Sequence, residues 1–540
     1  MAWYDEAVFY HIYPLGMTGA PKQNHYGQPE HRLNTLIPFI KKIKEMGFNA
    51  LYIGPLFESV GHGYETTDYK KLDTRLGTNE DLTNFVKECH KQRIRVILDG
   101  VFNHTGRDFF AFKDIRENRE LSKYKDWYCN VNFYGNNEYN DGFSYDNWGG
   151  YDLLVKLNQK NAEVKDYIYN IIRFWVEEFD IDGIRLDAAD VLDFSYMTMI
   201  RQAANEVKPD FWLMGEVIHG DYIRWVNSDT LHSVTNYHLH KALYSAHNDH
   251  NYFEIAHTVK RLYEMGGNKS NGLKLYNFTD NHDVERIYTK LNNKSHFIPV
   301  HILLYTLPGI PSVYYGSEFG IEGKKQYGSD DSLRPYLPYE EYVNLTLKNN
   351  FVDLITRLGN IRQNTKALSY GEYKELFLTT NQYAFIREYN NECAIITVNN
   401  SDNDFMMKLP AKDYKEYTGA LSGEKVSEED GYITVNVKAN SGEIWLPEVS
   451  FDKKVKPVKI NMKSTSQNDK TFKQKKEEIK AVKETETKSN KSYEKMTVSE
   501  LQNAIIKRME QNGPVTERMR QDVLDNVYHN SLVTWIKSFK

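Results

Sequence analysis

Short apolar runs alternate with segments of helical spacing between residues 7 and 315 of the chain. Runs rich in β-branched and aromatic residues predict strands, and apolar residues that recur every three or four positions predict helices. The predicted strands are residues 7–13, 50–53, 95–98, 183–187, 212–216, 233–237, 273–278 and 312–315. The predicted helices are residues 36–46, 79–92, 164–176 and 197–207. Eight strands that alternate with helices predict an α/β protein built on a parallel (β/α)8 TIM barrel.

An open, doubly wound parallel sheet would show the same alternation. Dinucleotide-binding sheets of that kind carry a glycine-rich phosphate loop between a strand and a helix. No predicted strand of this chain is followed by such a loop, so we favour the barrel. The apolar stretch 297–315 contains three prolines, and it is interpreted as a helix followed by a buried strand rather than a membrane helix.

The alternation breaks at residues 105–157, an aromatic and polar segment that is too long for an ordinary loop. We expect it to form an inserted lobe after the third strand. Short strand-like runs from about residue 370 predict an antiparallel β-sandwich. The predicted domains are the barrel in two parts (1–104 and 158–365), the lobe (105–157), the sandwich (366–449), a disordered charged linker (450–495) and a small helical module (496–540).

The helical module has short amphipathic segments that need an apolar surface to pack against. It is therefore either a small tethered domain or an element that docks a protein partner. The net charge of −6 gives no support for binding to nucleic acid or to a membrane. The three cysteines match neither a metal site nor a disulfide framework. Because the N-terminal residues show no signal peptide, we expect a cytoplasmic protein.

Charged residues mark the end of the predicted strand 183–187. Arg185 and Asp187 point to the same side of a strand, because side chains alternate with period two. The arginine favours the ionised carboxylate, so we expect Asp187 to be an anion at neutral pH. Taken by itself, the pair favours a structural ion pair at a strand end. Three similar clusters, 99–104, 214–217 and 278–283, also lie at strand ends, where TIM barrels carry their active sites.

Taken in the order of the chain, the four clusters resemble the motifs of the α-amylase superfamily of retaining glycoside hydrolases (glycoside hydrolase family 13). His62-Gly-Tyr64 and the segment 309–316 resemble further parts of that pattern. Val155-Lys-Leu-Asn158 is similar to a motif of the cyclomaltodextrinase, neopullulanase and maltogenic amylase group. The segment 189–191 departs from that group, which leaves acceptor preference open.

The resemblance implies a role for each matching residue. Asp187 would be the nucleophile, Glu216 the general acid/base, and Asp283 a third carboxylate that supports an oxocarbenium-like transition state. The remaining predicted site residues would either bind the sugar at the cleaved bond or hold the carboxylates in place. They are Tyr64, Asp99, His104, Arg185 and His282. Arg286 would pair with nearby acids. For both Asp99 and Arg286, support of the scaffold is as good an interpretation as direct contact with the substrate.

No cofactor is required by these roles, and no metal-ligand motif is present in the sequence. The resemblance leaves calcium open at Asn103, although we favour a hydrogen bond there. Three aromatic residues of the lobe, Tyr128, Phe133 and Trp148, could either pack its core or stack on sugars.

The sequence therefore predicts a hydrolase of α-1,4-glucosidic bonds in maltooligosaccharides, cyclomaltodextrins or starch-derived dextrins, with transglycosylation as a side reaction. An α-glucosidase or a glucosyl-transferring isomerase on the same scaffold is the alternative enzyme. A carbohydrate-binding protein with a lost active site is the alternative of another class, and the complete set of carboxylates argues against it.

Overall fold

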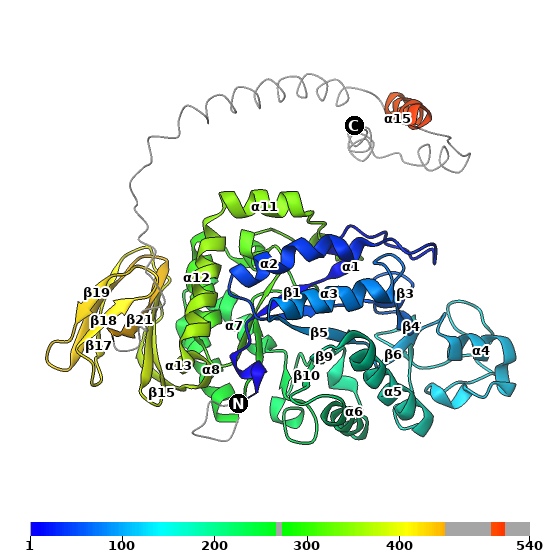
Figure 1. The fold of residues 1–540 in the computed structure, drawn as a ribbon, viewed down its shortest axis with the longest axis horizontal. Coiled ribbons are helices and arrows are strands. Elements are labelled where there is room, and N and C mark those ends of the chain that lie inside the picture. Colours follow the sequence, from blue (N-terminus) through cyan, green and yellow to red (C-terminus); the bar gives the residue numbers. More distant parts are fainter. Residues whose placement is uncertain (1, 266–272, 449–497, 513–540) are drawn as a thin grey trace. The chain divides into compact units, whose positions relative to one another are not determined.

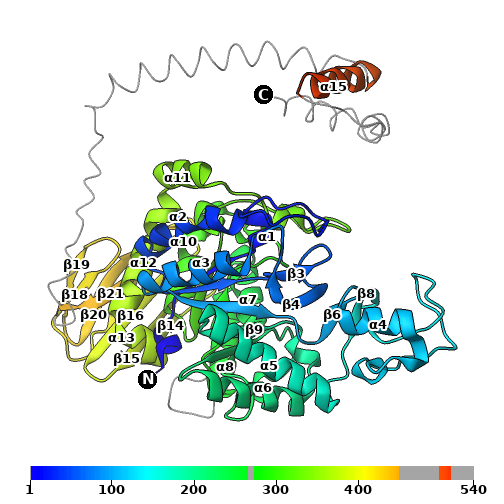
Figure 2. The same ribbon diagram turned by 45° about the vertical axis from the view of Figure 1, so that its right-hand side comes forward.

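The computed structural model describes residues 2–265, 273–448 and 498–512 of the chain. These residues fall into two compact units, 1–457 and 458–540, which are described separately. The first unit contains a barrel, a lobe and a C-terminal sandwich. In both Figure 1 and Figure 2 the lobe with α4 and the sandwich with β17–β21 lie on opposite sides of the barrel.

Eight parallel strands form the barrel, as the sequence predicts. In sheet order they run β11-β10-β9-β5-β2-β1-β13-β12. A parallel bridge between Thr235 and Tyr276 joins the two outer strands and closes the ring. The strands are β1 (Phe9–Ile12), β2 (Ala50–Ile53), β5 (Arg95–Gly100), β9 (Gly183–Leu186), β10 (Trp212–Gly215), β11 (Ser233–Val234), β12 (Tyr276–Phe278) and β13 (Ile310–Tyr314).

Helices surround these strands on the outside (Figure 1). Each turns an apolar face inward; on α5, for example, Ile168, Ile172 and Trp175 are buried. Such a stripe is what the hydrophobic effect selects in a helix that covers a sheet. The main barrel helices are α2 (Ile37–Glu45), α3 (Asn79–Lys91), α5 (Ala162–Phe179), α6 (Phe194–Val207), α7 (Tyr237–Asn248), α8 (Tyr252–Met265), α10 (Phe297–Thr306) and α12 (Asn350–Asn364).

The apolar stretch 297–315 becomes helix α10 followed by strand β13, which confirms the sequence-based interpretation. Residues on every face of α10 are buried. The C-terminal sandwich covers the side of this helix that the barrel does not, and Arg387 of β15 donates to the carbonyl of Thr306 at 2.7 Å. Among the described residues, no helix is long and apolar enough to span a membrane.

The inserted lobe contains a small antiparallel sheet of β6 (His104–Gly106), β8 (Tyr151–Lys156) and β7 (Asn147–Trp148). Helix α4 (Phe110–Asn118) packs beside it. Strand β6 follows closely after β5, so the lobe's sheet starts from the end of a barrel strand. This short connection places the lobe next to the end of the barrel where β5 stops.

Eight strands form the sandwich, and the sequence predicted five of them. One sheet has the order β14-β15-β16-β21-β18-β19, and the second pairs β17 with β20. The three additional strands are short or carry polar residues on one face, so their apolar pattern is weak. The strands are β14 (Glu372–Leu378), β15 (Gln382–Tyr389), β16 (Glu392–Asn399), β17 (Phe405–Pro410), β18 (Glu416–Gly419), β19 (Lys425–Ser427), β20 (Tyr432–Val437) and β21 (Ser441–Pro447).

In the second unit, helix α15 (Val498–Asn512) is described. It agrees with the helical patterning predicted for the module 496–540, and both Leu501 and Ile505 are buried. The predicted linker 450–495 and the rest of the predicted module, 513–540, lie outside the described residues.

Candidate active site

Arg185, near the end of strand β9, holds three carboxylates. Its Nη1 donates to Asp187 Oδ1 at 2.9 Å and to Asp99 Oδ1 at 2.8 Å, and its Nη2 pairs with Glu216 Oε2 at 2.9 Å. The guanidinium side chain is 3% exposed, so these ion pairs are shielded from water. Asp99 belongs to β5, Asp187 directly follows β9 and Glu216 directly follows β10. The three strands are adjacent in the barrel, which brings the three carboxylates to one arginine.

Glu216 has two further partners besides Arg185. The backbone N–H of Ala188 donates to its Oε2 at 3.2 Å, and the hydroxyl of Tyr237 donates to its Oε1 at 3.4 Å. Ala188 follows Asp187 directly and adopts a left-handed conformation with φ of +47°. This conformation is costly for a residue with a Cβ, and such strain concentrates at functional sites.

Asp283 is held by a second group of partners after strand β12. Its Oδ1 accepts from Arg334 Nη2 at 3.0 Å, and its Oδ2 lies 3.0 Å from His282 Nε2. Arg334 Nε also donates to the backbone carbonyl of His282 at 3.0 Å. The arginine lies over the ring of Tyr13, with 4.6 Å between the guanidinium carbon and the ring centre. These contacts fix the orientation of both Asp283 and His282.

Tyr64 connects the two groups. It lies between β3 (Phe57–Ser59) and β4 (Thr66–Leu72), which form a hairpin. Its hydroxyl donates to Asp99 Oδ2 at 3.1 Å and also contacts His282 Nε2. Its ring lies nearly parallel to that of His282, with 5.7 Å between the centres. The ring of His104 is buried beside the backbone of Tyr64. The structure thus brings together all eight site residues that the sequence predicted.

Burial and neighbouring charges move the pKa values of these groups in different directions. Burial lowers the pKa of His104 to about 3, so its imidazole is neutral at ordinary pH. Burial by itself would raise the pKa of Asp283, but His282 and Arg334 outweigh it and hold that pKa well below its usual range. Asp283 is therefore an anion throughout the physiological pH range.

Asp187 behaves differently from the sequence-based expectation. Burial raises its pKa well above the usual range, and the nearby Glu216 and Asp99 add to this effect, while Arg185 opposes it. The expectation that Arg185 alone keeps Asp187 ionised is wrong, because it omitted desolvation and the neighbouring acids. Asp187 and Glu216 are held on the two Nη atoms of the same guanidinium.

Several other predicted residues lie outside this network of carboxylates. The guanidinium of Arg286 donates to the carbonyls of Tyr315 and Leu333, so it supports the loops after β13. Asn103 accepts a hydrogen bond from Gln159 at 3.0 Å. This is a hydrogen bond of the kind that we favour at Asn103 over a calcium ligand. Among the described residues, no cluster of His, Cys, Asp and Glu has the arrangement of a metal site.

The aromatic residues of the lobe separate into two classes. Tyr128 is buried and Phe133 packs against the core, whereas 38% of Trp148 is exposed. The ring of Trp148 lies 5.9 Å from that of His104. Of the three, only Trp148 has its ring beside the ring of a predicted site residue.

Four residues of the site were missed by the sequence analysis: Arg334, Tyr237, Tyr52 and Tyr13. Tyr52 donates to Asp99 Oδ2 at 2.8 Å. Tyr52 lies within the predicted strand β2, and an aromatic residue in a strand predicts only a position in the core. Arg334 lies in a loop 51 residues after Asp283 and has no motif around it. Nothing in the sequence pattern marks these residues, because their role comes from the fold.

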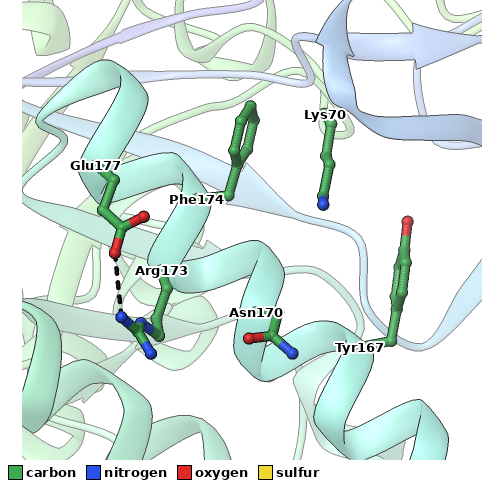
Figure 3. A pocket seen from close by; sticks show the side chains of 6 residues that line it. All are labelled: Lys70, Tyr167, Asn170, Arg173, Phe174 and Glu177. Atoms are coloured by element: carbon green, nitrogen blue, oxygen red, sulfur yellow. Dashed lines mark hydrogen bonds and ion pairs between the residues drawn. The ribbon is translucent and has the colours of Figure 1, made fainter.

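A separate hollow of about 500 Å³ lies on the outer side of α5 (Figure 3). Arg173 and Glu177 of α5 form an ion pair at its edge, and Lys70 of β4 extends toward it (Figure 3). The hollow is lined by Lys70, Tyr167, Asn170, Arg173, Phe174 and Glu177. None of the predicted site residues lines it.

Comparisons with known proteins agree with this architecture. The α-amylase catalytic domain model matches residues 31–335, and the α-amylase C-terminal domain model matches residues 371–445. A cyclomaltodextrinase of Thermoanaerobacter pseudethanolicus is 30% identical over 440 residues, covering 77% of this chain and 73% of the relative. Neopullulanase 2 of Thermoactinomyces vulgaris is 29% identical over 473 residues, covering 82% of this chain and 78% of the relative.

Among solved structures, a cyclomaltodextrinase superposes with a TM-score of 0.72 at 25% identity. The match covers 82% of this chain and 78% of that structure. The catalytic domain model spans more than half of the chain, and it includes every carboxylate of the network described above. The chain is an enzyme that belongs to the α-amylase family of glycoside hydrolases.

Proposed function

We propose that this enzyme cleaves α-1,4-glucosidic bonds of maltooligosaccharides and cyclomaltodextrins with retention of the anomeric configuration. The observation that carries the proposal is the pair of carboxylates, Asp187 and Glu216, held on the two Nη atoms of one buried arginine. Retaining glycoside hydrolysis needs two carboxyl groups close together, one anionic and one protonated. The names of the relatives, cyclomaltodextrinase and neopullulanase, support this substrate class.

In the first step, Asp187 attacks the anomeric carbon while Glu216 transfers its proton to the glycosidic oxygen. The bond to the leaving sugar breaks, and a glycosyl ester forms on Asp187. Arg185 holds Oδ1 of Asp187, and we assign the attack to Oδ2. The retaining mechanism requires Glu216 to carry a proton while Asp187 attacks as an anion. Glu216 then accepts a proton from water, which attacks the ester and releases the product with restored configuration.

The remaining residues bind the sugar whose bond is cleaved. Asp283 is an anion, and we assign it to the hydroxyl groups of that sugar and to stabilising the positive charge that develops on its ring. His282 and the neutral His104 are assigned as hydrogen-bonding partners of further hydroxyls. Asp99 holds Arg185 and Tyr64 in place. Another sugar that replaces water in the second step would give transglycosylation.

The proposal includes the organisation of the chain and its location. We assign the two barrel segments 1–104 and 158–365 and the lobe 105–157 to substrate binding and chemistry, and we propose that the enzyme works in the cytoplasm. One relative carries the name intracellular maltogenic amylase, which supports that location. The alternative enzyme, an α-glucosidase or a glucosyl-transferring isomerase, would use the same carboxylates.

The test is a time course of products, followed by NMR, from β-cyclodextrin and from maltoheptaose in parallel. We expect both to be hydrolysed, the ring at least as fast as the linear chain, with maltose or glucose released first in the α configuration. Release in the β configuration would contradict retention. Cleavage of maltoheptaose alone would favour the α-glucosidase alternative. The Asp187→Asn variant is the control, and equal turnover by it would overturn the assignment of the nucleophile.

A further inference from the structure

Trp148 stands on a hairpin of the lobe whose shape is set by its turn. Strands β7 and β8 are joined through Gly149 and Gly150, which have φ values of +66° and +84°. Two successive positive φ values are those of a tight hairpin turn of type I′, which favours glycine at both positions. Asn147 Oδ1 accepts a hydrogen bond from the N–H of Gly150 at 3.0 Å. The tip is therefore a defined structure rather than a loose loop.

The pairing of β7 with β8 is irregular at Trp148. Asn147 pairs with Val155, but Trp148 pairs with Tyr151, so the register shifts between two successive residues. Bulges of this kind change the direction of a side chain and are frequent beside active sites. Here the ring of Trp148 lies 5.9 Å from the ring of His104, at 31° to it. Trp148 remains 38% exposed in this position.

A series of contacts connects Trp148 to the proposed acid. It leads from Glu216 through Arg185 and Asp99 to Tyr64, then to His104 and finally to Trp148. Glu216 is assigned to the leaving sugar and His104 to the sugar that stays on the enzyme, so the ring contact with His104 associates Trp148 with the part of the glucan that stays. A buried core role does not explain a tryptophan that remains 38% exposed at this place.

We propose that Trp148 is a specificity-determining residue that stacks on the glucose unit preceding the one whose bond is cleaved, on its non-reducing side. The proposal rests on the function proposed above. The apolar face of a pyranose ring matches the flat face of an indole, and the ring is rigid, so little conformational entropy is lost on binding. The enzyme would therefore prefer substrates that have a further glucose unit on the non-reducing side of the unit whose bond is cleaved.

The experiment compares kcat/KM for maltohexaose with that for p-nitrophenyl α-D-glucopyranoside, which has no such preceding unit. In Trp148→Ala we expect the ratio of the two values to fall about three- to tenfold, the range of a single aromatic stacking contact. Trp148→Phe keeps an aromatic face and should recover most of the ratio. Tyr151→Ala is the matched control, since Tyr151 is on the same hairpin, 63% exposed, and should leave the ratio unchanged.

A ratio in Trp148→Ala equal to that of Tyr151→Ala would overturn the proposal. An equal loss on both substrates, not recovered by Trp148→Phe, would also overturn it, because it would show a structural role. A second measurement uses the Asp187→Asn variant of the full chain. Binding of maltohexaose should change the tryptophan fluorescence of this variant. The change should be lost in the double variant that also carries Trp148→Phe. Failure of the proposed function would look different, since the unmodified enzyme would then hydrolyse neither substrate.

Discussion

Arg334 donates from Nη2 to Asp283 Oδ1 at 3.0 Å, although 51 residues separate them in the chain. The same guanidinium donates to the backbone carbonyl of His282. A loop after the last barrel strand therefore holds one of the proposed catalytic carboxylates in its ionised form.

Replacing Arg334 should lower activity at neutral pH. Arg334 donates to Asp283 and helps to hold the pKa of that carboxyl well below its usual range. Asp283 must be ionised and correctly oriented in the proposed mechanism, so we expect kcat/KM of Arg334→Met at neutral pH to fall about tenfold to hundredfold.

The matched control for this experiment is Arg173→Met, because Arg173 is exposed on the outer side of α5 and far from the proposed chemistry. Its kcat/KM at neutral pH should equal that of the unmodified enzyme. Arg334→Lys should recover part of the lost activity. An unchanged kcat/KM in Arg334→Met would show that Arg334 does not support Asp283 in the reaction.

Glu216→Gln should lose more activity on substrates whose leaving group must be protonated than on substrates whose leaving group needs no proton. We expect kcat for maltoheptaose to fall about hundredfold or more, because the amide cannot protonate the leaving sugar. The first step should be affected much less for α-glucosyl fluoride, whose leaving group needs no proton, and the burst of fluoride checks this. Glu177→Gln, an exposed position on α5, is the control. Equal losses on both substrates would contradict the role of Glu216 as the acid.

Glu318 should make the stability of the protein depend on pH. It is buried, accepts a hydrogen bond from Tyr10, and burial raises its pKa from 4.5 to about 7. The folded protein therefore binds this proton more tightly than the unfolded chain does. The stabilisation is complete below pH 4.5 and is lost as pH rises to about 7, and the loss amounts to about 3 kcal/mol.

Glu318→Gln removes this titration, because the amide stays neutral. The decrease in Tm between pH 5 and pH 8, measured by calorimetry, should be smaller in the variant than in the unmodified protein. Glu322→Gln is the control, since the Glu322 side chain is 64% exposed. If Glu318→Gln and Glu322→Gln show the same decrease in Tm, Glu318 does not titrate in this range.

Deleting residues 452–540 should leave kcat/KM for maltoheptaose within about threefold of the full chain. Every residue of the site described above lies within the first compact unit, 1–457. The assay compares the two proteins at equal concentration of correctly folded enzyme, checked by circular dichroism. A much larger loss would show that the C-terminal part contributes to the site.

The sequence alone predicted the eight barrel strands and the order of the motifs. Strands such as β2 and β10 are buried along their whole length, so each appears as a short continuous apolar run between polar segments. Asp187 and Glu216 could be identified because each directly follows a predicted strand, and parallel strands end at the same edge of a barrel. These features are local, and local patterns are visible without coordinates.

Only the tertiary structure decided which partners these residues have and how they are charged. Arg334, Tyr237 and Tyr52 reach the site from distant segments, and no local pattern marks them. The raised pKa of Asp187 depends on its burial and on the acids around it, which sequence spacing does not measure. Trp148 likewise could not be distinguished from the core aromatic residues of the lobe. Its exposure and its contact with His104 result from a register shift between two strands, a property of the folded chain alone.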